Sequence, residues 1–319
     1  MKREIINISI VIPCNNEEEV LLDSVEKISK KLIKLSKKYD VDLNTSQIVI
    51  VDNGSTDKTW EIIKNLNKNN NFVKGVKLAN NFGHQSSLLA GLENTNCDII
   101  ISLDADLQDD LDTIDIMIEK YLQGFKIVYG VRKNRKKDSF LERNLAKIFY
   151  YLINILDKNI IKNHADFRLI TRKALDDLSK FKEVNVFIRG LVTKVSNNST
   201  IVYYNRNERK AGNSKYTFIP KISLAIDGFT SFSLLPLRII AVIGFFIFVL
   251  SLIIIIYYFI SYILIEKTVR GWTTIILSIY LLGGLQIFCL GIIAEYIGKI
   301  YLETKKRPRY IIDKILNKK

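Results

Sequence analysis

Two carboxylates stand directly after an apolar run: Asp104 and Asp106 follow residues 99–103, which are Ile-Ile-Ile-Ser-Leu. Such a short, β-branched and uncharged run predicts a buried strand. Carboxylates at the end of a buried strand are costly to desolvate unless a cation meets them. Mg²⁺ or Mn²⁺ holding a diphosphate is the natural candidate, because hard cations bind carboxylate oxygens.

Alternating strand and helix signals would place these carboxylates at one edge of a sheet. The alternation predicts an α/β fold with a mostly parallel, Rossmann-like sheet and helices on both faces. Ligands bind at the carboxyl ends of the strands in such sheets, and Asp52 and Asp104 both stand at such ends. Strands are expected at 8–12, 48–51, 73–78, 99–103, 127–129 and 201–204, and helices at 17–38, 59–66, 85–92, 112–121 and 140–156.

Two long apolar stretches near the C-terminus indicate a membrane. Residues 237–265 carry one charge at their edge, Arg238, and residues 272–293 carry none. Each stretch exceeds the roughly 20 residues that a membrane-crossing helix needs. Residues 217–235 mix apolar and charged side chains and predict an amphipathic helix on the membrane surface.

The net charge and the position of the basic residues help to decide between a nucleic-acid partner and a membrane surface. The formal net charge is +14, from 47 Lys and Arg against 33 Asp and Glu. A basic cluster at the C-terminal end follows the second apolar stretch, which favours a cytoplasmic, lipid-facing segment over a nucleic-acid surface. We therefore expect membrane but no nucleic acid among the partners. The three scattered cysteines suggest neither a disulfide framework nor a zinc site.

These patterns predict a domain order and a location. The sequence starts without a signal peptide, so we expect a multi-pass protein of the inner (cytoplasmic) membrane, with its large N-terminal domain and both termini in the cytoplasm. The expected parts are a soluble domain over 1–216, the amphipathic helix over 217–235, two membrane-crossing helices over 236–300 and a basic tail over 301–319.

Several ordered motifs resemble one family. Four lie in the first third of the chain: Pro13-Cys-Asn-Asn-Glu-Glu, Val51-Asp-Asn-Gly-Ser-Thr-Asp, Asn81-Phe-Gly-His-Gln and Asp104-Ala-Asp-Leu-Gln. Four lie later: Asp166-Phe-Arg-Leu, Arg189-Gly, Ala211-Gly-Asn-Ser-Lys-Tyr and Ala294-Glu-Tyr-Ile-Gly. Together they resemble the family 2 glycosyltransferases of GT-A fold, in the polyprenyl-phosphate branch that includes GtrB-like enzymes and dolichol-phosphate mannose synthases. The resemblance covers about residues 8–310.

The resemblance implies a reaction and its substrates. A hexose would move from a nucleotide sugar to the phosphate of a membrane polyprenol such as undecaprenyl phosphate, with inversion at the anomeric carbon and with Mg²⁺ or Mn²⁺ as cofactor. UDP-glucose is the expected donor, and GDP-mannose, UDP-GlcNAc and UDP-aminoarabinose are alternatives with the same motifs. The sequence leaves oligomeric state open, and a homo-oligomer is compatible with it.

The resemblance also implies roles for individual residues. Asp106 would be the direct metal ligand, assisted by the carbonyl oxygen of Gln108. Asp166 would be the catalytic carboxylate, with Asp104 and Asp106, and its alternative is a structural pair with Arg168 or Arg172. His84 would line the donor pocket or make a structural hydrogen bond. Donor binding is expected from Pro13, Asn15, Glu17, Asp52, Asp104, Ala105 and Arg132, and acceptor-phosphate binding from Arg135, Arg209 and Lys215.

The sequence departs from the family pattern at two positions, and two alternative functions compete with the family's reaction. Asn53 stands where many relatives have a second aspartate, and Asn15 where many have an aromatic residue; both fall near the expected base pocket. A processive polysaccharide synthase is disfavoured, because neither Trp60 nor Trp272 lies in a Gln-x-x-Arg-Trp motif. A catalytically silent scaffold that binds nucleotide sugars would predict lost carboxylates, whereas these carboxylates are present.

Overall fold

A computed structural model describes residues 5–133, 164–184, 187–205 and 272–317, together with 240, 242, 244, 246, 247 and 253. The chain divides into two compact units. The first combines Met1–Ile222 with Arg307–Lys319, and the second is Ser223–Lys306. The predicted helices over 140–156 and 217–235 lie outside the described residues.

Within the described residues of the first unit, eight strands form one sheet in the order β7-β5-β6-β4-β1-β2-β3-β8. β6 and β8 run antiparallel to their neighbours, and the other strands are mutually parallel. This confirms the predicted mostly parallel α/β sheet. The strands are β1 (Ile8–Cys14), β2 (Gln47–Asp52), β3 (Val73–Leu78), β4 (Ile99–Ser102), β5 (Ile127–Arg132), β6 (His164–Thr171), β7 (Ser199–Tyr204) and β8 (Ile312–Leu316).

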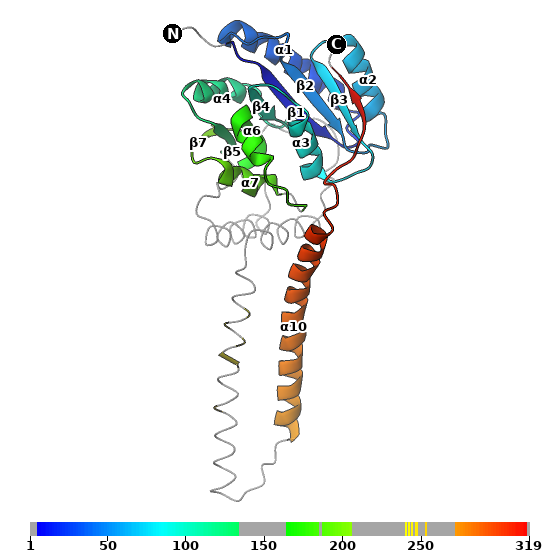
Figure 1. Cartoon of the computed structure of the whole chain (residues 1–319), viewed down its shortest axis with the longest axis vertical. Helices are drawn as coiled ribbons and strands as arrows, with labels where there is room; N and C mark the ends of the chain where they lie inside the picture. Colours follow the sequence, from blue (N-terminus) through cyan, green and yellow to red (C-terminus); the bar gives the residue numbers. More distant parts are fainter. Residues whose placement is uncertain are drawn as a thin grey trace, which may run out of the picture. The chain divides into compact units, whose positions relative to one another are not determined.

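Helices cover both faces of this sheet (Figure 1). Alternate strand residues such as Ile10, Ile50 and Ile101 pack with apolar side chains of α1, α2 and α4 in the main core. The strands are buried on both faces, so they consist of nearly continuous apolar runs. The helices of this unit are α1 (Leu21–Tyr39), α2 (Thr59–Asn69), α3 (His84–Glu93), α4 (Thr113–Leu122), α6 (Arg172–Leu178) and α7 (Ile188–Val195).

Helix α3 packs very closely on the face opposite that core. A Cβ atom added to Gly91 would lie 2.3 Å from Val11 Cγ1 and 2.9 Å from Val51 Cγ2. Glycine at this position therefore lets the helix approach β1 and β2. The close packing holds the C-terminal half of α3 against the sheet, and His84 and Gln85 begin the same helix.

The C-terminal segment differs from the prediction. We expected residues 301–319 to be a basic tail, but Ile312–Leu316 is strand β8, which pairs antiparallel with β3 (the red strand in Figure 1). The pairing is reinforced by Arg309, whose Nη2 lies 2.9 Å from Glu93 Oε1, and by Tyr310, whose hydroxyl donates to the same carboxylate. The sequence carries little signal for this strand, because Asp313 and Lys314 stand in its middle and its apolar residues Ile312, Ile315 and Leu316 do not alternate.

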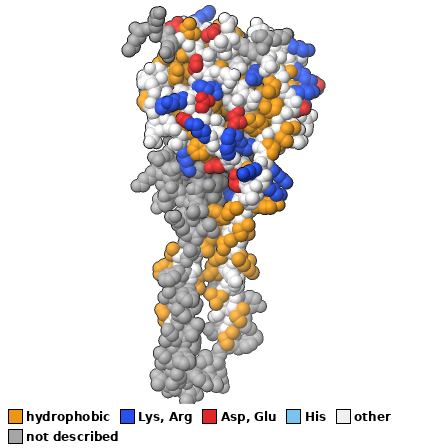
Figure 2. Space-filling model, in the orientation of Figure 1, with side chains coloured by type: hydrophobic (Ala, Val, Ile, Leu, Met, Phe, Trp, Pro, Cys, Tyr) orange, Lys and Arg blue, Asp and Glu red, His pale blue; other side chains and the backbone are white. Residues whose placement is uncertain are grey.

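In the second unit, the long apolar helix α10 spans Trp272–Thr304. Its apolar side chains, including Ile279, Ile287 and Leu290, are exposed along its surface (Figure 2). The stretch Leu282–Thr304 is long and apolar enough to cross a membrane, and it is the single such helix among the described residues. The first predicted crossing, within 237–265, lies almost wholly outside them.

Candidate active site

The candidate site lies at the carboxyl ends of the parallel strands, as predicted. Cys14 and Asp52 are register partners at the ends of β1 and β2. Asp104 follows β4 by two residues, and β4 lies on the other side of β1. The antiparallel strand β6 then starts beside the end of β4, with Ser102 opposite Arg168. This register brings Asp166 to the same edge, where the hydroxyl of Ser102 donates to its carbonyl oxygen.

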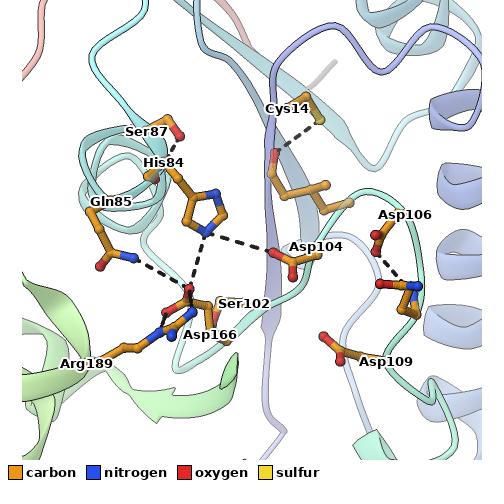
Figure 3. Close-up of polar contacts among 12 residues, drawn as sticks. Cys14, His84, Gln85, Ser87, Ser102, Asp104, Asp106, Asp109, Asp166 and Arg189 are labelled. Carbon is orange, nitrogen blue, oxygen red and sulfur yellow. Dashed lines mark hydrogen bonds and ion pairs between the residues drawn. The ribbon is translucent and has the colours of Figure 1, made fainter. Parts of the chain in front are cut away.

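Asp166 is the most heavily engaged carboxylate of the site (Figure 3). Its side chain is only 6% exposed and accepts hydrogen bonds from the guanidinium groups of Arg168 and Arg189. Arg189 approaches sideways, with Nε 3.1 Å from Oδ1 and Nη2 2.8 Å from Oδ2. Oδ2 also lies 3.3 Å from His84 Nε2 and 3.5 Å from Gln85 Nε2.

These contacts keep Asp166 ionised. Burial alone would raise the pKa of the Asp166 carboxyl, but the charge of Arg189, the hydrogen bond from His84 and the charge of Arg168 outweigh it. The net effect holds the pKa well below its ordinary value. A carboxylate this acidic is a poor proton acceptor at neutral pH and a strong anchor for cations. The predicted partner Arg168 is present, whereas Arg172 lies 3.6 Å from Asp176 instead.

His84 connects the two acidic parts of the site. Its Nε2 lies between Asp166 and Asp104, 3.9 Å from Asp104 Oδ1. Burial would lower the pKa of His84, but the hydrogen bond and charge of Asp166, together with the charge of Asp104, raise it above the ordinary value. Asp104 has a raised pKa, mainly because of burial, although His84 opposes that shift. Figure 3 shows the imidazole pointing toward both carboxylates.

The turn after β4 supplies oxygen donors that fit a divalent cation. Asp104 and Asp106 are separated by one residue, and Asp106 Oδ1 accepts a hydrogen bond from the Gln108 backbone at 3.2 Å. Leu107 makes this turn with a left-handed φ of 45°. No group of three His, Cys, Asp or Glu side chains among the described residues is arranged to hold a metal. Mg²⁺ commonly binds through one or two carboxylates plus substrate phosphates, so the donor set is chemically suitable.

Asp52, at the end of β2, has a buried carboxylate oxygen that can accept a hydrogen bond from a ligand. Its Oδ1 accepts from the Ser55 backbone at 3.1 Å, and its Oδ2 has no hydrogen-bond partner among the described residues. A buried acceptor of this kind is costly unless a ligand or water meets it. Asp52 Oδ2 is therefore suited to accept a hydrogen bond from a bound ligand, for example from a nucleobase N–H or a ribose hydroxyl.

The two departures from the family pattern form one structural link. Asn53 Nδ2 donates to Asn81 Oδ1 at 2.9 Å, and Asn53 Oδ1 accepts from the Phe82 backbone at 2.9 Å. Asn15 Nδ2 donates to the Asn53 carbonyl oxygen at 2.8 Å. The amides thus tie the end of β2 to the loop that precedes His84. Gly54 permits this approach, because a Cβ there would lie 2.6 Å from the Asn80 carbonyl carbon.

The other predicted donor residues lie around the same edge. Pro13 is the register partner of Val51. The Glu17 backbone donates to Thr59 Oγ1 at 2.9 Å, while Ala105 is buried and its carbonyl accepts from Ser24 Oγ at 2.6 Å. The structure therefore shows backbone contacts for Glu17 and Ala105. The predicted acceptor residues Arg135, Arg209 and Lys215 lie outside the described residues.

Arg132 is joined to two side chains that sequence reasoning did not assign to the site. Its Nε donates to the Tyr204 hydroxyl at 3.2 Å, and its Nη2 lies 3.8 Å from Asp109 Oδ1. Tyr204 in turn donates to Asp109, which is buried. Burial and the charge of Asp109 raise the pKa of Tyr204, so its hydroxyl stays protonated. The Arg-Gly motif at Arg189 also carries no sequence signal for the contact of this arginine with Asp166.

Comparison with known proteins identifies the family. Residues 9–179 match the family model described as Glycosyl transferase family 2. This chain is a family 2 glycosyltransferase. Residues 235–300 also match the model of the GtrB C-terminal hairpin, which covers the range predicted to cross the membrane twice.

Full-length relatives of this glycosyltransferase share more than a third of its residues. Glycosyltransferase YkoT of Bacillus subtilis is 44% identical, over 96% of this chain and 91% of the relative. A bactoprenol glucosyl transferase of Shigella phage SfX is 38% identical, over 96% of this chain and 98% of that protein. A prophage bactoprenol glucosyl transferase homolog of Escherichia coli is 37% identical, over 97% and 99%. The match therefore extends beyond the catalytic domain.

Proposed function

We propose that this glycosyltransferase moves glucose from UDP-glucose to a membrane polyprenyl phosphate, with inversion, and releases UDP. The observation that carries the proposal is the row Asp104, His84, Asp166 and Arg189, in which acidic and cationic groups face one edge of the sheet. Relatives named as bactoprenol glucosyl transferases, similar over nearly their whole length, support glucose and a polyprenyl acceptor. GDP-mannose, UDP-GlcNAc and UDP-aminoarabinose remain alternative donors for the same site.

The donor and its metal would use the turn after β4. Asp106 and Gln108 would hold Mg²⁺ or Mn²⁺, with Asp104 beside them. The bound ion would act as a Lewis acid that neutralises charge developing on the leaving diphosphate. Asp52, with its buried Oδ2, would bind the nucleoside, and Arg132 would contact the diphosphate.

The acceptor needs little help with proton transfer. The second pKa of a phosphate monoester is near 6, so the acceptor is already largely a dianion at neutral pH. The protein must mainly align it for in-line attack on the anomeric carbon. This agrees with an Asp166 that stays ionised and organises cations instead of accepting a proton.

The connectivity of the chain limits how many times the second unit can cross a membrane. Residues before Ser223 and after Lys306 belong to the same unit, since β8 joins the sheet that starts with β1. If the second unit crosses the membrane, it must do so an even number of times. Two crossings within 236–300 meet this condition and would leave both termini on the side of the catalytic domain. The basic residues after the second apolar stretch favour the cytoplasm as that side.

The test is a panel of nucleotide sugars mixed with undecaprenyl phosphate and the full-length protein in detergent. We expect a lipid-linked hexose, identified by mass, with UDP-glucose as the best donor and with activity lost on EDTA addition. A silent scaffold would release no UDP even with metal present. A product formed equally well in EDTA would contradict the metal role.

The matched variants for this test are Asp106→Ala and Asp112→Ala. Asp106→Ala is expected to abolish metal-dependent transfer, because it removes the ligand carboxylate. Asp112 lies in the same segment, but its side chain is 88% exposed and pairs with Lys31, so its removal should leave transfer nearly unchanged. Near-normal turnover by Asp106→Ala would contradict the assignment of Asp106 as a metal ligand.

A further inference from the structure

Arg189 differs from the other guanidinium group that holds Asp166. The side chain of Arg168 is 1% exposed and lies within the sheet, whereas that of Arg189 is 33% exposed. Both contact the same carboxylate, and Arg189 is the partner whose side chain reaches the surface of the site.

The position of Arg189 is fixed from two directions. It lies in the first turn of α7, whose first backbone N–H, from Ile188, donates to Gln85 Oε1 at 3.2 Å. The amide nitrogen of the same Gln85 lies 3.5 Å from Asp166 Oδ2. Gln85 thus holds the start of α7 against the carboxylate that orients the guanidinium. A group held this way binds a ligand without a large cost of ordering.

The surroundings of Arg189 call for an anionic ligand next to the donor site. Asp166 and His84 are the groups that separate it from Asp104 along one row of contacts. A phosphate dianion approaching Asp104 and Asp106 would be repelled unless cations met it. A guanidinium group is well suited, since its planar N–H groups can bind phosphate oxygens in pairs.

We propose that Arg189 binds the phosphate monoester of the lipid acceptor and that Asp166 is its positioning residue. The proposal rests on the proposed function and adds a residue of the described structure to the acceptor site. In the step it serves, an acceptor phosphate oxygen bonds to the anomeric carbon. The bond from that carbon to the diphosphate oxygen breaks, and its electron pair leaves with the nucleoside diphosphate. No proton is transferred when the acceptor is a dianion.

The first test is protection of arginines from phenylglyoxal in the full-length protein, measured by mass spectrometry. Farnesyl phosphate is the probe, with farnesol, inorganic phosphate and UDP at equal concentration as comparisons. We expect farnesyl phosphate alone to lower modification of Arg189 at least fivefold. Arg172, with a similar 30% exposure, should react equally in every sample, and buried Arg168 should not react.

Unchanged Arg189 modification under farnesyl phosphate would overturn the proposal. Equal protection by inorganic phosphate would overturn the assignment to a lipid acceptor, and protection by UDP alone would assign Arg189 to the donor. This readout needs no sugar transfer, so it stands apart from the proposed function. That function fails instead if the wild-type protein forms no lipid-linked sugar from any donor.

The second test separates acceptor binding from the structural contact to Asp166. Arg189→Lys keeps a charge near Asp166 but loses paired hydrogen bonding to phosphate. We expect the KM for undecaprenyl phosphate to rise about tenfold or more, because hydrogen bonds to charged groups are the strong ones. The donor KM should stay within about twofold, as it should for the control Lys194→Gln on the same helix. A rise in donor KM with an unchanged acceptor KM would contradict the proposal.

Discussion

The carboxylate of Asp166 shows how burial changes the role of a residue. It is 6% exposed, and its charge is compensated by Arg168, which is almost completely buried. Such pairs cost much more when broken than they contribute when whole, since removing one partner strands the other charge. The sequence identified Asp166 but not this environment, because Arg189 is separated from it by 23 residues.

Replacing Asp166 by asparagine is therefore expected to destabilise the catalytic domain as well as to stop transfer. The loss in free energy of unfolding should be about 3–5 kcal/mol, because Arg168 is left buried without its counter-charge. Urea unfolding in detergent, followed by Trp60 fluorescence in a Trp272→Phe background, measures it. The control Asp176→Asn, which removes a 61% exposed carboxylate, should change stability by less than about 0.5 kcal/mol.

The pH dependence of this difference has a definite sign. The pKa of Asp166 is lower in the folded state than in the unfolded state, so its contribution is present above the ordinary value of about 4. It is lost as the pH falls through that value toward the folded pKa. The stability gap between wild type and Asp166→Asn should be constant from about pH 8 to pH 5 and should narrow below about pH 4. A gap that widened on acidification would contradict the ion pairs described here.

Among the elements, α3 connects the site to the far edge of the sheet. His84 and Gln85 at its start contact Asp166, and Glu93 at its end contacts Arg309 and Tyr310 of the C-terminal segment. Arg309 Nη1 also donates to the Phe181 carbonyl at 3.1 Å. The C-terminal segment thus stabilises the helix that carries two residues of the site.

Replacing Glu93 by glutamine should weaken this contact while keeping its shape. Arg309 and Glu93 are 15% and 22% exposed, so the lost charge-assisted hydrogen bonds should cost about 1–3 kcal/mol of unfolding free energy. Urea unfolding with the Trp60 signal measures this cost. Asp313→Asn is the matched control, because Asp313 is 44% exposed and 3.9 Å from Lys77. Equal small effects of both variants would show that the contact contributes little.

Sequence patterns predicted the parallel part of the sheet well and its antiparallel additions poorly. The strands and helices up to β5 were found within a few residues, because each is a compact apolar run between turns. β6 contains Asp166 and Arg168, so its polar side chains hide a buried strand. β8 has the same problem, with Asp313 and Lys314 in its middle. Likewise, the link from Arg132 through Tyr204 to Asp109 joins residues far apart in sequence, and local patterns carry no signal for it.

At the scale of the whole molecule, a long apolar helix interrupts the sequence of the catalytic unit. The second unit lies in the sequence between two parts of the first, and its helix α10 has 33 residues. At 1.5 Å per residue that helix is about 50 Å long, more than the roughly 30 Å hydrocarbon core. Its charged end contains Glu295 and Lys299, which are 3.8 Å apart, so this end suits the membrane surface.

A cation in the apolar middle of α10 should therefore impair its insertion. Leu290→Arg should cost about 2.5–3.5 kcal/mol for insertion, whereas Ile300→Arg near the charged end should cost much less. A reporter fused to the C-terminus and assayed for its side of the membrane gives the readout. We expect partial relocation for Leu290→Arg and none for Ile300→Arg. Identical distributions for the two variants would argue against a membrane crossing by this helix.

Strand β8 also dictates an order of assembly. Because β8 follows α10 in the chain, the ribosome releases it only after α10 has been synthesised. Until then the outer edge of β3 lacks its neighbour, and Glu93 lacks Arg309 and Tyr310. A strand translated after α10 therefore completes the catalytic sheet, so a nascent chain whose β8 is still inside the ribosome has an unfinished catalytic domain.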